Sequence, residues 1–579
     1  MAGEVQKKKS AMVMTVTKDR DVPLDKIRNM GIIAHIDAGK TTTTERILFE
    51  TGKTYRLGSV DEGTTVTDWM AQERERGITI VSAAITTFWD LKSKSSVEDG
   101  RYRINIIDTP GHIDFTAEVE RSLRVLDGAL MVFDGRTGVE SQSETVWRQA
   151  DKYKVPRICV LNKLNLIGAD FEASLKSIKE RLGANAAPVV IPIGLEHEHR
   201  GVVDLIRMKA LTYKAIEDNK LTEEEIPADL LESAKKYRTE LIEKVSEFDD
   251  EALNKFLEGQ EPDEVLLKRA IRKGVVAGKF FPIFGGDNRT VETQLILDGV
   301  IEYLPSPLDM PPVEGSNPKT GEKELRQRKV EDSFSAVAFK VITDPHVGRL
   351  VYLRIYSGKL SSGQVVYNAT KQTSERIGKL VLLHADQREL IEDAFAGEIV
   401  AAVGLKETTT GHTLCDPGHP ILLESITFPE PVISLAIEPA TKSDQEKMGL
   451  ALNKLSDEDP TFRIKSNVET GQTIISGMGE LQLEVLVDRM KREFSVVATT
   501  GAPQVAYKET IKKIAEGEGK YIRQTGGHGQ YGHCLLRIEP LGRGEGFKFE
   551  SEIKGGAIPQ EFISPIEKGV KEKLENGIM

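Results

Sequence analysis

Apolar residues recur along this chain with two different spacings, and the alternation between them predicts its secondary structure. In the first half, runs of apolar residues typical of buried strands alternate with segments whose apolar residues recur every three or four positions, as in helices. The clearest of these segments are 104–108, 115–126, 129–134, 144–153 and 157–162. Strands that alternate with helices form a parallel sheet covered by helices, so we predict an α/β domain over residues 26–308.

The remaining patterns indicate a multidomain chain that combines α/β, β and α+β parts. Helical periodicity dominates 171–182 and 228–275, and we interpret residues 171–275 as an insert in the α/β domain. Prolines between 305 and 312 mark a linker, and glycine-spaced strands over 309–427 are typical of a small β-barrel. Helical periods at 446–456 and 480–494, mixed with strands, predict an α+β domain over 428–500, and residues 501–579 begin a second one. Residues 1–25 read as a disordered tail.

Composition narrows the class of protein without changing this domain plan. Of 579 residues, 39% are hydrophobic and 29% are charged, and no run of roughly 18 apolar residues could span a membrane. Three cysteines are too few and too scattered for a disulfide framework or a zinc site. The net charge of −12 argues against a general nucleic-acid coat protein. We therefore expect a cytoplasmic protein with no membrane segment.

A phosphate-binding loop is predicted between the first strand and the first helix. Backbone amides and a helix N-terminus would face the phosphates, a lysine would neutralise them, and a threonine hydroxyl would bind Mg²⁺. The residues expected to do this are Ala34, His35, Ile36, Asp37, Ala38, Gly39, Lys40, Thr41 and Thr42. Ala34 stands where the general motif has glycine, and a chance Gly-Lys-Thr at a helix start is the alternative for this stretch alone.

A second polar cluster, formed by five consecutive residues, ends the strand at 103–107. Its carboxylate would hold the Mg²⁺ shell through water, its glycine amide would face a γ-phosphate, and its histidine would reach an attacking water. These residues are Asp108, Thr109, Pro110, Gly111 and His112. An ordinary β-turn is the alternative, but the position one strand after a phosphate loop favours a hydrolytic site.

A third element, Asn162-Lys163-Leu164-Asn165, follows a later strand, where an N-K-x-D base-recognition motif would lie. With these three elements in order, the chain resembles the elongation factor G family of translational GTPases. The resemblance spans residues 28–579 and is carried by the runs 34–41, 76–80, 143–150, 428–432, 477–481 and 503–507.

The resemblance implies GTP as substrate and Mg²⁺ as the metal, with specific roles for several residues. Asp37, Ala38, Gly39 and Lys40 would cradle phosphate. Thr41 and Thr79 would bind Mg²⁺ directly, with Asp108 acting through water, and His112 would orient the hydrolytic water once a ribosome docks. Thr79 would belong to a switch loop that the γ-phosphate orders.

The resemblance also implies partners and a domain plan. The third domain would be ferredoxin-like and the fourth ribosomal-protein-like, and the protein would act as a monomer on ribosomal RNA and ribosomal proteins. The glycine-rich stretch 526–533 would lie at a tip that enters the decoding site beside tRNA and mRNA, where His528, Gln530 and Tyr531 would stack or hydrogen-bond. A plain glycine-rich hairpin is the alternative for this stretch.

The base-reading positions depart from the family pattern. Asn165 stands where the family has aspartate, which accepts hydrogen bonds from both guanine N1–H and the 2-amino group. Losing one charge-assisted hydrogen bond costs about 1.5–3 kcal/mol, or roughly 10- to 150-fold in guanine affinity, whereas xanthine would suit asparagine better. Gly286-Asp287 replaces the family's Ser-Ala; the Gly286 amide is expected to reach guanine O6, with Asp287 adding a negative charge. We therefore hypothesise weakened guanine selectivity.

The chain also stops within the family's fourth domain, and the fifth is absent, so a truncated reading frame or a fragment is expected. The favoured function is a ribosome-stimulated GTPase that promotes translocation of tRNA and mRNA. A ribosome-recycling or ribosome-protection factor, and a nucleotide-dependent ribosome-binding module without turnover, remain as alternatives. A phosphate-loop ATPase is disfavoured by Asn162 and Lys163.

Overall fold

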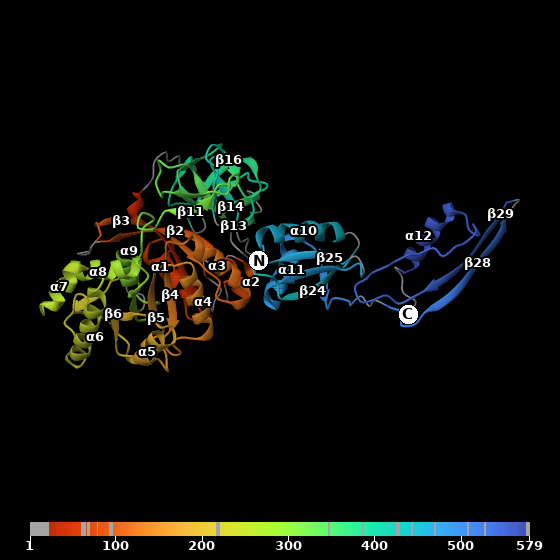
Figure 1. Ribbon diagram of the computed structural model, residues 1–579. Coiled ribbons are helices and arrows are strands. Elements are labelled where there is room, and N and C mark those ends of the chain that lie inside the picture. Colours follow the sequence, from red (N-terminus) through yellow and green to blue (C-terminus); the bar gives the residue numbers. More distant parts are fainter. Residues whose placement is uncertain are drawn as a thin grey trace, which may run out of the picture. The chain divides into compact units, whose positions relative to one another are not determined.

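The computed structural model describes residues 22–58, 65, 70–77, 79–91, 97–215, 220–344, 348–384, 387–423, 429–441, 444–467, 470–505, 509–525 and 528–574. The chain divides into two compact units. The first comprises Met1–Lys465 with Thr473–Gly501, and the second Ser466–Gln472 with Ala502–Met579 (Figure 1). Among the described residues, no helix combines the length and apolar character that a membrane crossing requires.

A ten-stranded sheet forms the centre of the α/β domain. Its order is β2-β3-β1-β4-β5-β10-β6-β7-β8-β9; the strands from β3 to β6 run parallel, while β2 and β7–β9 pair antiparallel at the two edges. The strands are β1 (Ile27–Ala34), β2 (Ala83–Leu91), β3 (Gly100–Asp108), β4 (Gly128–Asp134), β5 (Arg157–Asn162), β6 (Ala186–Ile193), β7 (Gly201–Asp204), β8 (Lys209–Thr212), β9 (Thr222–Glu224) and β10 (Phe281–Gly285). The predicted parallel sheet is confirmed, and the predicted insert continues it through β6 to β9.

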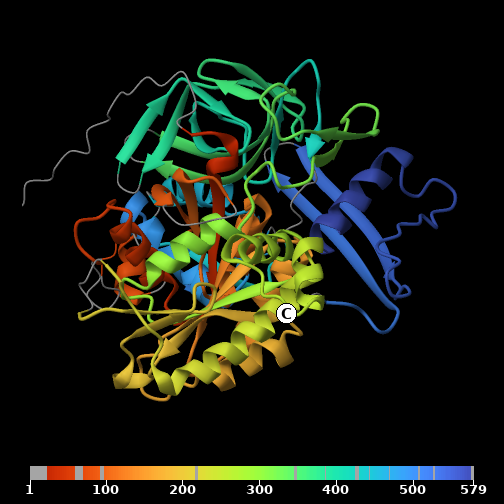
Figure 2. The same ribbon diagram turned by 90° about the vertical axis from the view of Figure 1, so that its left-hand side faces the viewer.

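Helices cover both faces of this sheet (Figures 1 and 2). Side chains alternate along β1, so Met30 and Ile32 pack into one core and Ile33 into the other. The helices are α1 (Lys40–Glu50), α2 (Ala71–Arg76), α3 (Thr116–Val125), α4 (Ser141–Lys152), α5 (Phe171–Arg181), α6 (Ala228–Ser246), α7 (Asp250–Leu257), α8 (Glu264–Val276) and α9 (Thr293–Tyr303). Three short 3₁₀ turns are η1 (Leu24–Lys26), η2 (Ile113–Phe115) and η3 (Glu196–Glu198).

The predicted N-terminal tail is too long by a few residues. Val22 and Leu24 are buried and pack with Ile27, so residues 22–25 belong to the folded domain. Residues 1–21 lie outside the described part of the chain. The polar, charge-rich segment 61–76 predicts a mobile loop, but its last six residues form helix α2 (Ala71–Arg76); of 61–70, the structure describes only 65 and 70.

A β-rich domain follows. Its main sheet has eight strands in the order β17-β16-β22-β13-β14-β21-β18-β19. Val351, Leu353 and Ile355 share its buried core, as their alternation in the sequence predicts. The strands are β11 (Val313–Ser316), β12 (Lys323–Arg326), β13 (Ser335–Asp344), β14 (Gly348–Ser357), β15 (Lys359–Ser361), β16 (Val365–Asn368), β17 (Thr373–Arg376), β18 (Lys379–His384), β19 (Gln387–Ile391), β20 (Asp393–Phe395), β21 (Ile399–Val403), β22 (Thr413–Cys415) and β23 (Leu422–Leu423).

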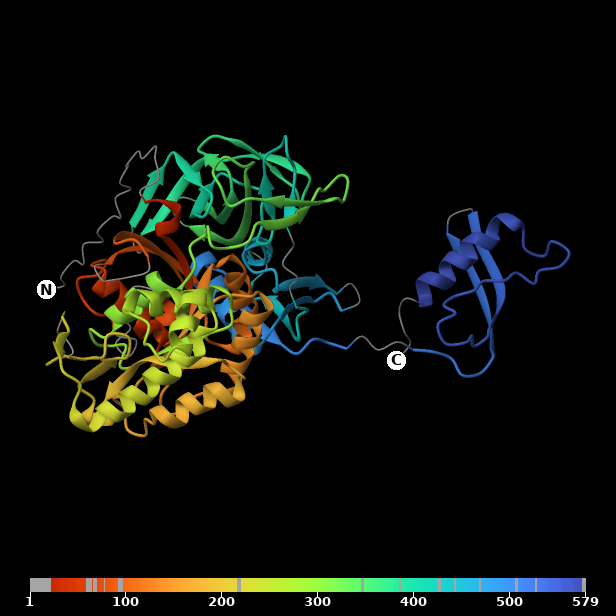
Figure 3. The same ribbon diagram turned by 60° about the vertical axis from the view of Figure 1, so that its left-hand side comes forward.

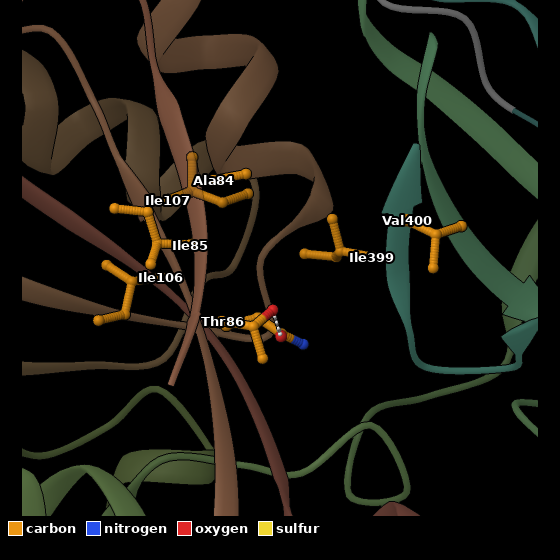
Figure 4. A pocket seen from close by; sticks show the side chains of 8 residues that line it. Ala84, Ile85, Thr86, Ile106, Ile107, Ile399 and Val400 are labelled. Carbon is orange, nitrogen blue, oxygen red and sulfur yellow. Dashed lines mark hydrogen bonds between the residues drawn. The ribbon is translucent and has the colours of Figure 1, made fainter. Parts of the chain in front are cut away.

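Apolar contacts join the β-rich domain to the edge of the central sheet. Ile399 of β21 packs in one apolar core with Ile107 of β3 and Ala84 of β2, beside a cavity of about 10 Å³ (Figure 4). Such a volume holds at most one water molecule. The two domains therefore pack closely here, and the cavity is too small for a ligand.

The α+β domain of the first unit consists of a four-stranded sheet and two helices. The sheet order is β25-β26-β24-β27. Leu483, Leu486 and Met490 of the second helix are buried in the core, as its amphipathic pattern predicts. The elements are β24 (Ile433–Pro439), α10 (Asp444–Glu458), β25 (Arg463–Ser466), β26 (Thr473–Gly477), α11 (Glu480–Phe494) and β27 (Ala498–Gly501).

The described residues of the second unit form one long hairpin and one helix. Strands β28 (Ala515–Thr525) and β29 (His528–Ile538) pair antiparallel, and η4 (Gln560–Phe562) leads into α12 (Ile563–Leu574), which lies across the hairpin (Figure 3). Gly526 and Gly527, at the predicted tip, lie outside the described residues. The Tyr531 side chain, close to this end of the hairpin, is 67% exposed.

Candidate functional site

The loop between β1 and α1 depends on two residues in the left-handed backbone region. Asp37 has a φ of 63° and Gly39 a φ of 92°. A Cβ atom on Gly39 would lie 2.2 Å from Asn162 Nδ2, so glycine is required here for both conformation and space. No side chain caps the first turn of α1, and amides at such a helix N-terminus are good partners for a phosphate group.

Residues at the N-terminus of α4 form hydrogen bonds with this loop. The Ile36 amide donates to Gln142 Oε1 at 3.0 Å, and His35 Nδ1 lies 3.1 Å from Ser143 Oγ. Burial lowers the pKa of His35, against the opposing effect of Glu140, which lies 3.4 Å from Nε2. Ala34 is buried at the end of β1. These contacts tie His35 and Ile36 to α4.

Lys40, Thr41, Thr79 and Asp108 converge at the start of α1. The Lys40 ammonium lies 3.2 Å from Thr79 Oγ1 and 3.5 Å from Asp108 Oδ1, and Lys40 is only 7% exposed. Thr41 Oγ1 and Thr79 Oγ1 are 3.3 Å apart. Thr42 is half-buried in the same helical turn. The fold thus brings the predicted phosphate-binding lysine and the predicted metal ligands to one point.

The oxygen atoms at this point fit a magnesium ion. Mg²⁺ takes oxygen ligands at about 2.0–2.1 Å in octahedral geometry, which places adjacent ligands about 3 Å apart. The 3.3 Å between the Thr41 and Thr79 hydroxyls is close to that separation. The buried Asp108 carboxylate supplies negative charge nearby. These three side chains could hold the ion.

The segment after β3 lies against the phosphate loop. Thr109 Oγ1 donates to the Ile32 carbonyl at 2.8 Å, and Pro110 is buried beside it. A Cβ atom on Gly111 would lie 3.7 Å from the His35 carbonyl oxygen, and the Gly111 carbonyl accepts a hydrogen bond from Gln142 Nε2. Thr109 therefore anchors the segment through β1, while Gly111 comes close to the loop backbone.

His112 is held through one of its ring nitrogens. Its Nδ1 accepts a hydrogen bond from the Asp114 amide at 3.2 Å, and its ring meets Phe115 edge to face with centroids 6.1 Å apart. The same Nδ1 lies 3.4 Å from Asp114 Oδ1, so Asp114 faces this nitrogen with both its amide and its carboxylate. In the neutral tautomer that carries its proton on Nε2, Nδ1 accepts from the amide. No described residue hydrogen-bonds Nε2, and the side chain is 27% exposed.

Asn162 and Lys163 connect the predicted base-recognition segment to the phosphate loop. Asn162 Nδ2 donates to the Ala38 carbonyl at 2.9 Å, and Lys163 donates to the Asp37 carbonyl and to Asp134 Oδ2. Burial alone would raise the pKa of Asp134, but hydrogen bonds from Arg136 and Lys163 outweigh it and lower the pKa to about 2. Asp134 is therefore a carboxylate that keeps Lys163 against the loop.

Asn165 lies two residues after Lys163, with its side-chain oxygen buried. This Oδ1 makes no hydrogen bond with the residues that the structure describes. A buried amide group without a partner costs free energy unless a ligand satisfies it. Asn165 Oδ1 can therefore accept a hydrogen bond from a ligand at this end of the site.

The expectation that the Gly286 amide reaches a guanine base is wrong. This amide donates to the Leu161 carbonyl at 3.0 Å, because β10 pairs with β5 and extends the strand hydrogen bonds by one residue. The Asp287 amide donates to Glu292 Oε2 at 2.7 Å, and the Asp287 carboxylate pairs with Arg289 at 3.1 Å. Both amides are therefore engaged within the protein.

Sequence reasoning missed several residues that shape this site. Gln142 contacts both the phosphate loop and Gly111, and Asp134 holds Lys163. The Asn288 backbone amide donates a hydrogen bond to Asn162 Oδ1 at 3.0 Å, and its side-chain Nδ2 donates one to Thr43 Oγ1 at 2.7 Å. These contacts join residues 29 to 245 positions apart, so no local pattern could reveal them. For Gln142 the one signal was its position directly before the run 143–150.

Four family models match consecutive parts of the chain. The model for the elongation factor Tu GTP binding domain matches residues 25–306, and that for elongation factor G domain 2 matches residues 333–417. The models for elongation factor G domains III and IV match residues 428–502 and 503–579. The first match indicates a GTPase domain that binds a guanine nucleotide.

A solved structure supports the same assignment. A crystal structure of a protein from Thermus thermophilus aligns with a TM-score of 0.77 and 31% sequence identity. The alignment covers 95% of this chain and 78% of that chain. The order of the four family models and the extent of this likeness show that the chain belongs to the elongation factor G family of translational GTPases.

Proposed function

We propose that this protein is a ribosome-stimulated GTP hydrolase that promotes movement of tRNA and mRNA during elongation. The observation that carries the proposal is the position of the Thr79 hydroxyl, which lies 3.2 Å from Lys40 Nζ and 3.3 Å from Thr41 Oγ1. A switch segment that reaches the phosphate-binding lysine and the start of α1 is suited to respond to a γ-phosphate. We further propose that the protein acts in the cytoplasm as a monomer.

Phosphate binding would be shared between the loop backbone and one lysine. Asp37, Ala38 and Gly39 would present their amides, and the buried Lys40 would neutralise the β- and γ-phosphate oxygens. Mg²⁺ bound by Thr41 and Thr79, with Asp108 behind a water molecule, would neutralise the charge that develops on the triphosphate. Closure of the Thr79 segment would also reduce access of bulk water.

His112 would act on the attacking water. With Nδ1 accepting from the Asp114 amide, the proton on Nε2 can be donated to a water oxygen, and this orients the water without removing its proton. Gly111 would offer its amide to the γ-phosphate from beside the loop. The ring is partly exposed, which suits a group that moves into place when the ribosome docks.

Selectivity for guanine would be weaker in this protein than in relatives that carry aspartate at the Asn165 position. The Asn165 amide can accept one hydrogen bond from guanine N1–H or from the 2-amino group, but its NH₂ would then face a second donor. Neither the Gly286 nor the Asp287 amide can compensate for the lost guanine contact, because each already donates a hydrogen bond within the protein. Xanthosine triphosphate, with a carbonyl at position 2, would therefore compete better than in an aspartate-bearing relative.

The second unit would contact tRNA and mRNA through the end of the β28–β29 hairpin. Gln530 and Tyr531 are exposed near this end, and an aromatic ring together with an amide suits stacking and hydrogen bonding to nucleotides. A nucleotide-dependent ribosome-binding module without turnover is the second candidate, favoured by the base-reading departures at Asn165 and Gly286.

Single-turnover phosphate release from GTP, measured with and without ribosomes, separates the two candidates. For a ribosome-stimulated hydrolase we expect slow release by the free protein, strong acceleration by ribosomes, and loss of that acceleration in His112→Ala. Displacement of mRNA on stalled ribosomes, read by primer extension, then tests translocation. Nucleotide-dependent docking without phosphate release would instead establish the binding module and contradict the proposal.

A further inference from the structure

The residue that contacts His112 also contacts another domain. Asp114 lies in η2, and its carboxylate reaches the N-terminus of α11 in the α+β domain. Oδ2 accepts hydrogen bonds from the Leu481 amide at 3.0 Å and the Gln482 amide at 3.4 Å. The two partners are 367 and 368 positions away in the sequence.

Asp114 takes the place of a helix cap that α11 lacks. Position Gly479 directly precedes the helix and has no side chain, so it cannot accept from the first free amides. An aspartate that accepts from these amides satisfies them, and its negative charge lies at the positive end of the helix dipole. The carboxylate is 13% exposed, which limits screening by solvent. The α/β domain thus supplies the N-cap of a helix in another domain.

Gly479 is the residue that makes this contact possible. A Cβ atom there would lie 2.1 to 2.3 Å from the atoms of the Asp114 carboxyl group. The Gly479 backbone is extended, with a φ of −167°, so any residue could adopt it. Space for the carboxylate, and not backbone conformation, is therefore the reason for glycine at this position.

The same helix contacts the segment that leads to Thr79. Gln72 of α2 donates to the Val485 carbonyl at 3.4 Å, and Glu75 of α2 forms an ion pair with Arg492 at 2.8 Å. Helix α2 ends at Arg76, three residues before Thr79. Helix α11 therefore contacts the chain on both sides of the candidate hydrolytic site, next to Thr79 and next to His112.

We propose that Asp114 is a positioning residue that couples the placement of α11 to the orientation of His112. Its carboxylate holds the helix through Oδ2 and lies 3.4 Å from His112 Nδ1 through Oδ1, while its amide donates to the same ring nitrogen. Movement of the α+β domain away from the α/β domain would withdraw the carboxylate and release the ring. This inference rests on the proposed function, in which His112 acts on the attacking water.

The test uses Asp114→Ala, Asp114→Asn and Gly479→Ala in the full chain, with Gly449→Ala as the matched control. Gly449 lies in α10 of the same domain, and a Cβ atom there meets nothing within 4 Å. We expect ribosome-stimulated hydrolysis to fall about 10- to 100-fold in Asp114→Ala and Gly479→Ala, as for a misplaced catalytic group. The Kd for a fluorescent GTP analogue should stay within about twofold, since phosphate binding does not use Asp114.

Two further readouts separate positioning from a merely structural effect. Asp114→Asn keeps an acceptor oxygen and should retain most of the activity. The double variant Asp114→Ala with Gly479→Ala should be no worse than Asp114→Ala alone, because the added methyl group acts only through the carboxylate. Hydrogen exchange of the Leu481 and Gln482 amides should accelerate in both single alanine variants but not in Gly449→Ala.

Wild-type hydrolysis in both Asp114→Ala and Gly479→Ala would overturn the inference while leaving the proposed function intact, provided His112→Ala is inactive. Equal loss of nucleotide binding and hydrolysis would also overturn it, since Asp114 would then be only structural. Full activity of His112→Ala would contradict the proposed function itself. If Asp114→Ala fails to fold, Gly479→Ala carries the same comparison, with Asp114→Asn as the variant that keeps the acceptor.

Discussion

Arg354 of the β-rich domain and Asp127 of the α/β domain form a fully buried ion pair, with Arg354 Nη2 2.7 Å from Asp127 Oδ2. The two side chains are 0% and 1% exposed. Asp127 also accepts hydrogen bonds from Asn29 at 2.7 Å and Arg328 at 3.2 Å. Asp127 is therefore one of the buried carboxylates that join the two domains, together with Glu398, which pairs with Arg103 at 3.1 Å.

Removing Asp127 should leave the buried Arg354 guanidinium without a partner carboxylate, whereas removing Arg354 leaves Asp127 paired with Arg328. We expect Asp127→Ala to lower the free energy of unfolding by about 3–5 kcal/mol, measured by urea denaturation, and Arg354→Ala to lower it by less. Breaking the exposed pair of Arg463 and Glu430, 2.8 Å apart, serves as the control and should cost less than about 1 kcal/mol. Equal costs for the buried and exposed pairs would contradict the assignment.

Gly39 provides a steric test of the phosphate loop. Gly39→Ala would place a methyl group 2.2 Å from Asn162 Nδ2, so the loop and the base-side segment must separate. We expect affinity for a fluorescent GTP analogue to fall at least about 100-fold, by analogy with other misplaced site groups.

Gly52→Ala is the matched control for this prediction. Gly52 also has a positive φ, 70°, but a Cβ atom there meets nothing within 4 Å. Its substitution should cost about 1 kcal/mol of backbone strain and leave nucleotide affinity unchanged. Similar losses of affinity in both variants would show that backbone strain, and not the contact with Asn162, limits position 39.

Asn165→Asp should restore guanine recognition. A carboxylate accepts from both N1–H and the 2-amino group, so GTP affinity should rise by roughly 10- to 150-fold while xanthosine triphosphate affinity falls. Competition of both nucleotides against one fluorescent analogue measures the change. A wild-type protein that already strongly prefers GTP, with no change in Asn165→Asp, would refute the weakened selectivity.

Lys340 should give the protein a pH-dependent stability. Its ammonium is buried, donates to the Ser82 carbonyl and lies 5.7 Å from the Tyr352 ring centre. Burial lowers the pKa of Lys340 to about 7, against 10.5 for the free group, despite the opposing charges of Glu73 and Glu458.

Between pH 7 and 10.5 the unfolded state therefore binds more protons at this lysine than the folded state, so its contribution to stability rises with pH. Relative to Lys340→Met, the wild type should gain on the order of 3–5 kcal/mol of unfolding free energy across this window. Urea denaturation at pH 6.5 to 10 measures the difference, with Lys379→Met as the exposed control. A constant difference between wild type and Lys340→Met would contradict the depressed pKa.

Local patterns predicted much of the fold, because strand and helix periods depend on nearby residues. The parallel strands β3, β4 and β5 and the helix α11 lie where the periodicity indicated. The contiguous loop at Gly39 and Lys40 was equally visible. Contacts between residues far apart in the sequence could not be predicted from local patterns. Gln142 hydrogen-bonds to Ile36, 106 positions away, and Asp114 hydrogen-bonds to Leu481, 367 positions away.

The error at Gly286 has a related cause. A backbone amide after a strand is available to a ligand only if the strand pairing has ended, and the sequence does not show where β10 and β5 stop pairing. The length of the disordered N-terminal tail was overestimated for a similar reason, because the burial of Val22 and Leu24 depends on packing against Ile27.

Single-turnover cleavage of GTP on ribosomes by Thr79→Ala and Thr79→Ser tests the central claim most directly. Thr79→Ser keeps the hydroxyl that lies 3.3 Å from Thr41 Oγ1, whereas Thr79→Ala removes it. We predict near wild-type cleavage for Thr79→Ser and a loss of at least about 100-fold for Thr79→Ala, equivalent to about 3 kcal/mol of transition-state stabilisation. Equal cleavage by Thr79→Ala and wild type would contradict the assignment of this hydroxyl to the hydrolytic centre.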